Sequence, residues 1–158
     1  MNDTTKNQIL KLIHQEVIPA IGCTEPIAVA LAAAKAAELL GTKPEKIDVY
    51  LSANILKNAM GVGIPGTGMV GLPIAIALGV LIGKSSYELE VLKDVTPEAL
   101  EAGKQLIHDQ VIHIALKENV DKLYIEVVCQ AGDSKSVAVI AHEHTRFVYC
   151  AKDDQVLL

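Results

Sequence analysis

The sequence predicts an α+β fold in which apolar helices pack on a mostly antiparallel sheet. Helical patterns dominate the first two-thirds, where long runs of alanine, leucine and isoleucine follow typical helix-capping residues. The last third changes to short segments of alternating apolar and polar residues, the pattern of strands. The length of 158 residues is enough for one domain with its own core. We therefore expect residues 1–158 to form a single α+β domain, with the sheet built largely from the last third.

Four helices are predicted in the first two-thirds. The first follows the capping residues 3–5, and the second has Thr24 as its N-cap and Gly41 just past its end. The third covers about residues 69–82, after a glycine-rich loop. The fourth begins with a Thr96 cap followed by proline, which favours the first helical position.

Strands are predicted for residues 46–53, 111–116, 122–131, 135–142 and 145–152. In the first of these segments Ile47, Val49 and Leu51 alternate with polar residues, as in a half-buried strand. Gly132 and Asp133 mark a tight turn between two of the later strands.

Two predicted helices are apolar on nearly every face. The segment from Ile27 to Leu40 carries only two charged residues, and residues 69–82 carry none. Helices of this kind lie in the interior of a larger body. We therefore expect a partner, either more polypeptide or another subunit, and a homo-oligomer is possible.

The uncharged run from Asn58 to Gly83 is longer than the roughly 20 residues that span a bilayer. Its first half contains four glycines and Pro65, which oppose a continuous helix, and its helical half is too short to span. We interpret it as a core helix and expect no membrane partner. The net charge of -5 and the 3% aromatic content argue against nucleic acid as a partner.

The three cysteines are odd in number and none forms a C-x-x-C pair, which is typical of a reducing compartment. The polar N-terminus does not resemble a signal peptide, so we expect a cytoplasmic protein. Cys129 and Cys150 lie in predicted strands and are interpreted as core residues. Cys23 directly precedes the Thr24 cap, where helix amides favour a thiolate, so it is either a nucleophile or metal ligand, or a buried thiol.

Two further motifs have both a structural and a functional interpretation. The glycine-rich loop matches G-x-G-x-x-G twice, but it does not directly follow a strand, so dinucleotide binding is disfavoured. It is either a close-packing element or a set of backbone amides for a small anion such as a carboxylate. The "AHEHT" segment contains His142 and His144, two residues apart. They are either a pair of metal ligands, or part of a polar turn, or one of them contacts a substrate.

Three long strings carry a resemblance to a known family, and they are GCTEPIAVALAAA, NILKNAMGVGIPGTGMVGLPIAIALG and YELEVLKDVTPEAL. The sequence here resembles the iron–sulfur L-cysteine desulfidases, which are similar to the alpha part of bacterial iron–sulfur L-serine dehydratases. The resemblance is strong from Gly22 to about Leu100, and it is weak in the strand region, where only "HEHT" matches. It implies a lyase that converts L-cysteine to pyruvate, ammonia and sulfide.

The resemblance also implies a cofactor and site residues. Enzymes of this family hold a [4Fe-4S] cluster through three cysteines, and an open iron acts as a Lewis acid. Cys23 corresponds to one cluster ligand, and Asn58, Thr67 and His144 correspond to polar positions around the substrate. Gly66 adjoins Thr67 in the substrate loop, and Glu25 is expected to orient the Cys23 loop or to handle a proton.

This chain departs from the family in two ways. Ala59 replaces the glycine of the family's Lys-Asn-Gly, and the remaining cluster cysteines lie in a second half that is missing here. The resemblance thus implies the N-terminal part of a longer lyase, or one subunit of a split enzyme. The other cysteines would come from a C-terminal half or second subunit, and the chain alone is expected to hold no cluster. The alternatives are a portion of an L-serine dehydratase, or a catalytically silent module that binds a small ligand or a partner.

Overall fold

The computed structural model describes residues 24–59, 63–64 and 69–158 of the chain. The helices are α2 (Thr24–Leu40), α3 (Ala53–Ala59), α4 (Leu72–Ile82), the 3₁₀ helix η1 (Ser85–Glu90) and α5 (Pro97–His108). The strands are β1 (Lys46–Leu51), β2 (Gly63–Ile64), β3 (Met69–Val70), β4 (Ile112–Leu116), β5 (Tyr124–Ala131), β6 (Ser134–Ala141), β7 (Phe147–Lys152) and β8 (Gln155–Val156). The predicted α+β class is confirmed, and the first predicted helix lies outside the described residues.

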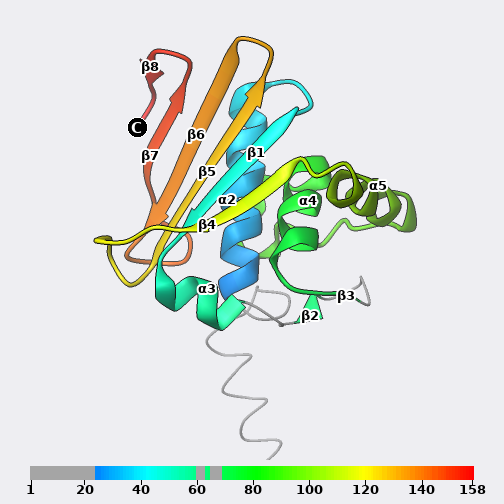
Figure 1. Ribbon diagram of the computed structural model, residues 1–158, viewed down its shortest axis with the longest axis horizontal. Coiled ribbons are helices and arrows are strands. Elements are labelled where there is room, and N and C mark those ends of the chain that lie inside the picture. Colours follow the sequence, from blue (N-terminus) through cyan, green and yellow to red (C-terminus); the bar gives the residue numbers. More distant parts are fainter. Residues whose placement is uncertain (1–23, 60–62, 65–68) are drawn as a thin grey trace, which may run out of the picture.

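The main sheet has six strands in the order β4-β1-β5-β6-β7-β8 (Figure 1). Only β4 and β1 are parallel, and every other neighbouring pair is antiparallel. Residues of β1 with odd numbers, Ile47, Val49 and Leu51, are fully buried beneath the sheet. Asp48 and Tyr50 lie on the opposite, open face and are half-buried. The sheet therefore has one face packed on helices and one face without a helix among the described elements, as Figure 1 shows.

Helix α2 is the centre of the core. It packs against β5, β6 and β7 on one side and against α4 on another. Side chains from Ile27 to Ala34 are at most 1% exposed. The apolar circumference of α2 is thus covered by this chain itself, because the helix lies between the sheet and a second helical layer. The apolar pattern of α2 consequently gives no argument for a missing partner.

Helices α2 and α4 approach each other very closely and run in the same direction. A Cβ atom added to Gly79 would overlap the backbone oxygen of Ala30, and one added to Gly83 would lie 2.9 Å from the Cβ of Ala34. Because both contacts advance by four residues along each helix, the helices are parallel. Their N-termini therefore lie at the same end of the molecule, as Figure 1 also shows.

Two elements differ from the sequence predictions. A loop was expected directly after β1, but the short helix α3 forms there because the buried Ser52 side chain accepts a hydrogen bond from the Ile55 amide at 3.4 Å. The third helix was expected from Met69 and begins at Leu72 instead. Gly71, with φ of 91°, precedes it, and β3 pairs with β2 before the helix starts.

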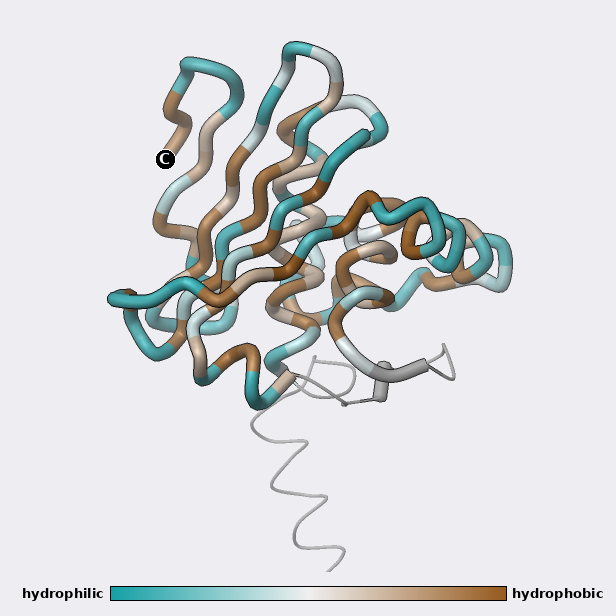
Figure 2. Tube along the Cα trace, viewed as in Figure 1, coloured by the Kyte–Doolittle hydropathy of each residue, from teal (hydrophilic) through white to brown (hydrophobic). Residues whose placement is uncertain are grey.

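The remaining boundaries agree closely with the sequence. The Thr96 hydroxyl caps α5 by accepting from the Ala99 amide at 3.1 Å, and Gly132 forms the β5–β6 turn with φ of 57°. The strands of the last third lie within the predicted segments, except that β6 begins just before its segment, at Ser134, and β8 was not predicted. Figure 2 shows hydrophobic residues concentrated in the strands and central helices, with hydrophilic residues in the turns. Among the described residues, no helix has both the length and the apolar character needed to cross a bilayer.

Candidate functional site

The first turn of α2 is the place where predicted site residues meet. Glu25 lies in this turn, directly after Thr24, and its side chain is 27% exposed. The N-terminus of α4 lies at the same end of the molecule, as described above. The first amides of a helix lack partners within the helix, and the helix dipole is positive at that end, so this end of the molecule favours negative charge.

His144 reaches this turn from the other end of the sequence. Its Nε2 atom lies 3.6 Å from Oε1 of Glu25, and its side chain is 34% exposed. His144 belongs to the loop between β6 and β7, while α2 packs against both strands. The packing of α2 on the sheet thus brings together two residues that the resemblance assigned to one site.

His142 does not join His144. Its Nδ1 atom lies 2.8 Å from Oδ2 of Asp121 in the loop between β4 and β5. The two histidines therefore contact different carboxylates and do not form a metal pair in this arrangement. No group of three or more histidine, cysteine, aspartate or glutamate residues within ranges 24–59, 63–64 and 69–158 has the geometry of a metal site.

Asn58 lies on the last turn of α3 and is exposed. Helix α3 packs against α2, so Asn58 is carried by an element next to the one that carries Glu25. The other predicted site residues, Cys23, Gly66 and Thr67, lie outside the described residues. The structure therefore pairs Glu25 with His144, and it places Asn58 on a neighbouring helix.

The two strand cysteines lie away from this arrangement, in the sheet. Cys129 is fully buried and Cys150 is 3% exposed, and both are free thiols. Burial raises the pKa of Cys129 to about 12, with a smaller rise from Asp48, while the hydrogen bond to Ser136 lowers it. Burial also raises the pKa of Cys150, against the opposing charge of Lys35. The sequence interpretation of both as core residues agrees with this burial.

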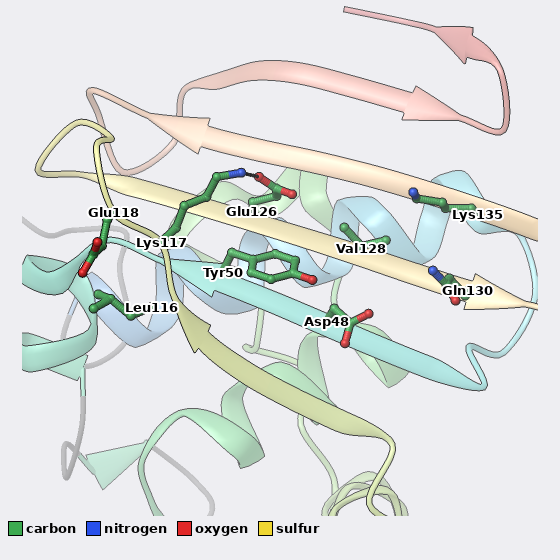
Figure 3. Close-up of a pocket in the computed structure, with 9 residues that line it drawn as sticks. All are labelled: Asp48, Tyr50, Leu116, Lys117, Glu118, Glu126, Val128, Gln130 and Lys135. Carbon is green, nitrogen blue, oxygen red and sulfur yellow. Dashed lines mark hydrogen bonds and ion pairs between the residues drawn. The ribbon is translucent and has the colours of Figure 1, made fainter.

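A second cluster of polar side chains lies on the open face of the sheet, in a shallow hollow of about 650 Å³ (Figure 3). Oε1 of Glu126 accepts hydrogen bonds from Nζ of Lys117 and from the Tyr124 hydroxyl, each at 2.7 Å. The Lys117 ammonium also lies 5.8 Å from the ring centroid of Tyr50. The hydrogen bond to Glu126 raises the pKa of Lys117, and burial is the main cause of the raised pKa of Tyr124.

Sequence reasoning did not identify this cluster or the partner of His142. Strand alternation indicates which residues of β5 share a face, but Lys117 follows β4, and its contact with Glu126 depends on how the strands are ordered. Asp121 lies in a polar loop, where an aspartate gives no signal of a partner. In both cases the missing information is the pairing of segments that are distant in the sequence.

Comparison with known proteins gives relatives whose names state no activity. The chain is 69% identical over 157 residues to a UPF0597 protein of Parabacteroides distasonis, an alignment that covers 99% of this chain and 36% of the relative. It is 50% identical over 159 residues to a UPF0597 protein of Porphyromonas gingivalis, covering 100% of this chain and 37% of the relative. For a UPF0597 protein of Aeromonas hydrophila the identity is 45% over 149 residues, covering 94% of this chain and 34% of the relative.

The chain thus spans slightly more than a third of the length of these relatives. No protein-family model matches the chain. No solved structure matches it either. The similarity to UPF0597 proteins is therefore a similarity in sequence, and the chemistry must be argued from the residues.

Proposed function

We propose that this chain is part of a [4Fe-4S]-dependent lyase that eliminates sulfide from L-cysteine to give pyruvate and ammonia. The proposal starts from the resemblance at Gly22–Ala34, at residues 54–79 and at residues 87–100. A portion of an L-serine dehydratase is the alternative within the same chemistry. The enzyme would work in a reducing cytoplasm, which agrees with the free thiols of Cys129 and Cys150.

One observation carries the proposal, and it is the contact between Glu25 and His144. The two residues come from opposite ends of the described chain, yet their side chains meet at 3.6 Å. Glu25 comes two residues after Cys23, the expected cluster ligand. Both side chains are partly exposed, so they are open to a substrate or to a second polypeptide.

The chemistry that these side chains offer is proton handling and orientation. A histidine next to a carboxylate is a typical general acid–base group, because the carboxylate fixes the orientation of the ring. The side-chain amide of Asn58 can donate to a substrate carboxylate, and the helix N-termini favour the same negative group. When bound, the cluster would supply an open iron for the leaving group.

The described residues do not fit a complete cluster on their own. A [4Fe-4S] cluster of this kind needs three cysteines, and Cys129 and Cys150 are buried in the sheet at strand positions. The proposal therefore requires two further cysteines from another polypeptide segment. The relatives are almost three times as long as this chain, which agrees with a further segment that contributes to the site.

The experiment is anaerobic production of the chain alone and together with the rest of a full-length relative. We expect no stable iron–sulfur product from the chain alone, because it supplies one candidate ligand. The assembled protein should contain four irons per chain and should release sulfide and pyruvate from L-cysteine. Pyruvate from L-serine but not from L-cysteine would favour the dehydratase alternative.

The control distinguishes the lyase from a silent module that binds a small ligand or a partner. His144→Gln and Glu25→Gln are tested in the assembled protein beside Asp109→Ala, which alters an exposed residue at the end of α5. Both site variants should keep the cluster and lose turnover. A stable four-iron cluster in the isolated chain, or an assembled protein without iron, would refute the proposal.

A further inference from the structure

The loop that carries His144 is held firmly at its first residue. His142 has φ of 74°, a left-handed conformation that residues other than glycine rarely adopt. Its backbone N–H donates to the carbonyl of Leu123 at 3.2 Å, and its ring Nδ1 lies 2.8 Å from Oδ2 of Asp121. Both partners belong to the loop between β4 and β5. That loop therefore fixes the backbone and the ring of His142 together.

The β6–β7 loop is also closed on itself. The amide of Arg146 donates to the carbonyl of Glu143, and the amide of Ala141 donates to the carbonyl of Arg146, each at 3.1 Å. His144 lies between these closures, two residues from His142. A change in the backbone conformation of His142 therefore changes where the His144 ring lies relative to Glu25.

The β4–β5 loop has an anchor of its own in the core. The hydroxyl of Ser52 donates to the carbonyl of Lys122 at 2.6 Å, and the Ser52 amide donates to the carbonyl of Tyr124 at 3.1 Å. Ser52 is only 4% exposed, and it also caps α3. One buried side chain thus fixes both the loop that contains Asp121 and the helix that carries Asn58.

We propose that Asp121 and His142 are positioning residues that set the His144 ring against Glu25. Asp121 and His142 do not contact Glu25 in this arrangement, and the pair is exposed, with side chains 47% and 56% accessible. An exposed pair of this kind is weak alone. Here the Asp121–His142 pair only has to select one orientation of the β6–β7 loop, because the backbone hydrogen bonds of that loop already form. The catalytic consequence of this positioning rests on the proposed function, while the positioning itself does not.

The test follows the histidine rings of the full chain by two-dimensional ¹H–¹⁵N NMR at fixed pH. His144→Gln and His142→Asn assign the two rings. Asparagine also tolerates a left-handed backbone, so His142→Asn removes the ring with the least effect on the loop. Asp121→Ala removes the acceptor, and Asp121→Asn keeps an acceptor oxygen. Asp109→Ala is the matched control, because Asp109 Oδ1 accepts an exposed 2.8 Å bond from Gln105.

We expect Asp121→Ala and His142→Asn to shift the His144 ring signals, Asp121→Asn to restore them, and Asp109→Ala to leave them unchanged. Glu25→Gln should shift the His144 signals without moving those of His142. Circular dichroism on the same samples checks the fold. If Asp121→Ala unfolds the chain, His142→Asn supplies the same test. His144 signals that stay in place in a folded Asp121→Ala or His142→Asn variant overturn the proposal.

A second measurement separates this inference from the proposed function. In the assembled enzyme, Asp121→Ala should lower kcat by up to about 100-fold with little change in KM, because displacing a catalytic group by about 1 Å has effects of this size. Asp121→Asn should recover most of the loss. A shifted His144 ring with unchanged kcat would support the positioning and overturn the catalytic role of His144.

Discussion

The three cysteines differ in the surroundings that the chain gives them. Cys129 and Cys150 are buried side chains of β5 and β7, and burial raises the pKa of each. Cys23 directly precedes the first residue of α2 in the sequence. The amides of a first helical turn lack partners within the helix, so they favour a thiolate next to it.

Cys23 should therefore alkylate faster than the other two cysteines in the isolated chain. The expected cause is a larger thiolate fraction at Cys23, whereas the strand cysteines stay protonated. The measurement is labelling with iodoacetamide at pH values on either side of neutrality, with each site quantified by mass spectrometry. A chain unfolded in denaturant is the control, since all three sites should then label at similar rates. Equal rates in the folded chain would contradict the prediction.

At the scale of single residues, the sequence indicated which residues belong to the candidate site better than it indicated which residues contact each other. Glu25 and His144 followed from the resemblance, but their 3.6 Å separation depends on how α2 lies on the sheet. The Asp121–His142 contact had no sequence signal, because it joins two polar loops. The left-handed backbone of His142 had no sequence signal either, because this conformation is uncommon for residues other than glycine.

At the scale of elements, the close packing of α2 and α4 depends on glycine. Gly79→Ala would place a Cβ against the backbone oxygen of Ala30, which cannot move without shifting α2. We expect a loss of about 1–3 kcal/mol in the free energy of unfolding, the range for overpacked cores. The measurement is urea denaturation followed by circular dichroism.

Gly103→Ala is the matched control, because Gly103 also lies inside a helix. Its added Cβ would meet the terminal Cδ1 atom of Ile74 at 3.1 Å, which is the far end of a side chain and not backbone as at Gly79. Alanine favours a helix over glycine by about 1 kcal/mol, so this variant should be neutral or stabilised. Gly79→Ala with the same stability as Gly103→Ala would show that the two helices are not in close contact.

Element prediction succeeded where one pattern dominated and failed where two competed. The strands of the last third alternate clearly, and the Thr96 cap with its following proline fixed the start of α5. Helix α3 was missed because its seven residues are too few to show a period. The start of α4 was misplaced because Met69 and Val70 are as apolar as the helix, while strand pairing takes them out of it.

At the scale of the whole molecule, several groups make stability depend on pH in the same direction. The pKa values of Cys129 and Tyr124 are raised, mainly by burial, and that of Lys117 is raised by its hydrogen bond to Glu126. A raised pKa means that the folded chain holds the proton more tightly than the unfolded chain does. This stabilisation is complete below the unfolded pKa and decreases as pH rises above it.

The free energy of unfolding should therefore fall as pH rises above about 9, where an unfolded cysteine thiol ionises. The contribution of Cys129 extends to about pH 12, where the folded thiol ionises. Each such group contributes at most about 1.4 kcal/mol per pH unit within its window. Urea denaturation between about pH 7 and about pH 11, which spans the ordinary cysteine and tyrosine pKa values, measures the trend. Cys129→Ala is the control, and in this variant the free energy of unfolding should fall less steeply with pH above about 9. An unchanged dependence on pH would contradict the role given to Cys129.

The central place of α2 has a consequence for the order in which the chain folds as it is synthesised. This helix is made early, yet the strand that covers it is made late, and the Ser136 hydroxyl that donates to the Ala36 carbonyl lies 100 residues further on. At about 5–20 residues per second, a ribosome needs roughly 5–20 s to supply that strand. During this interval an apolar helix has no sheet to cover it. Chaperone binding to nascent chains should therefore concentrate on α2 until β6 emerges.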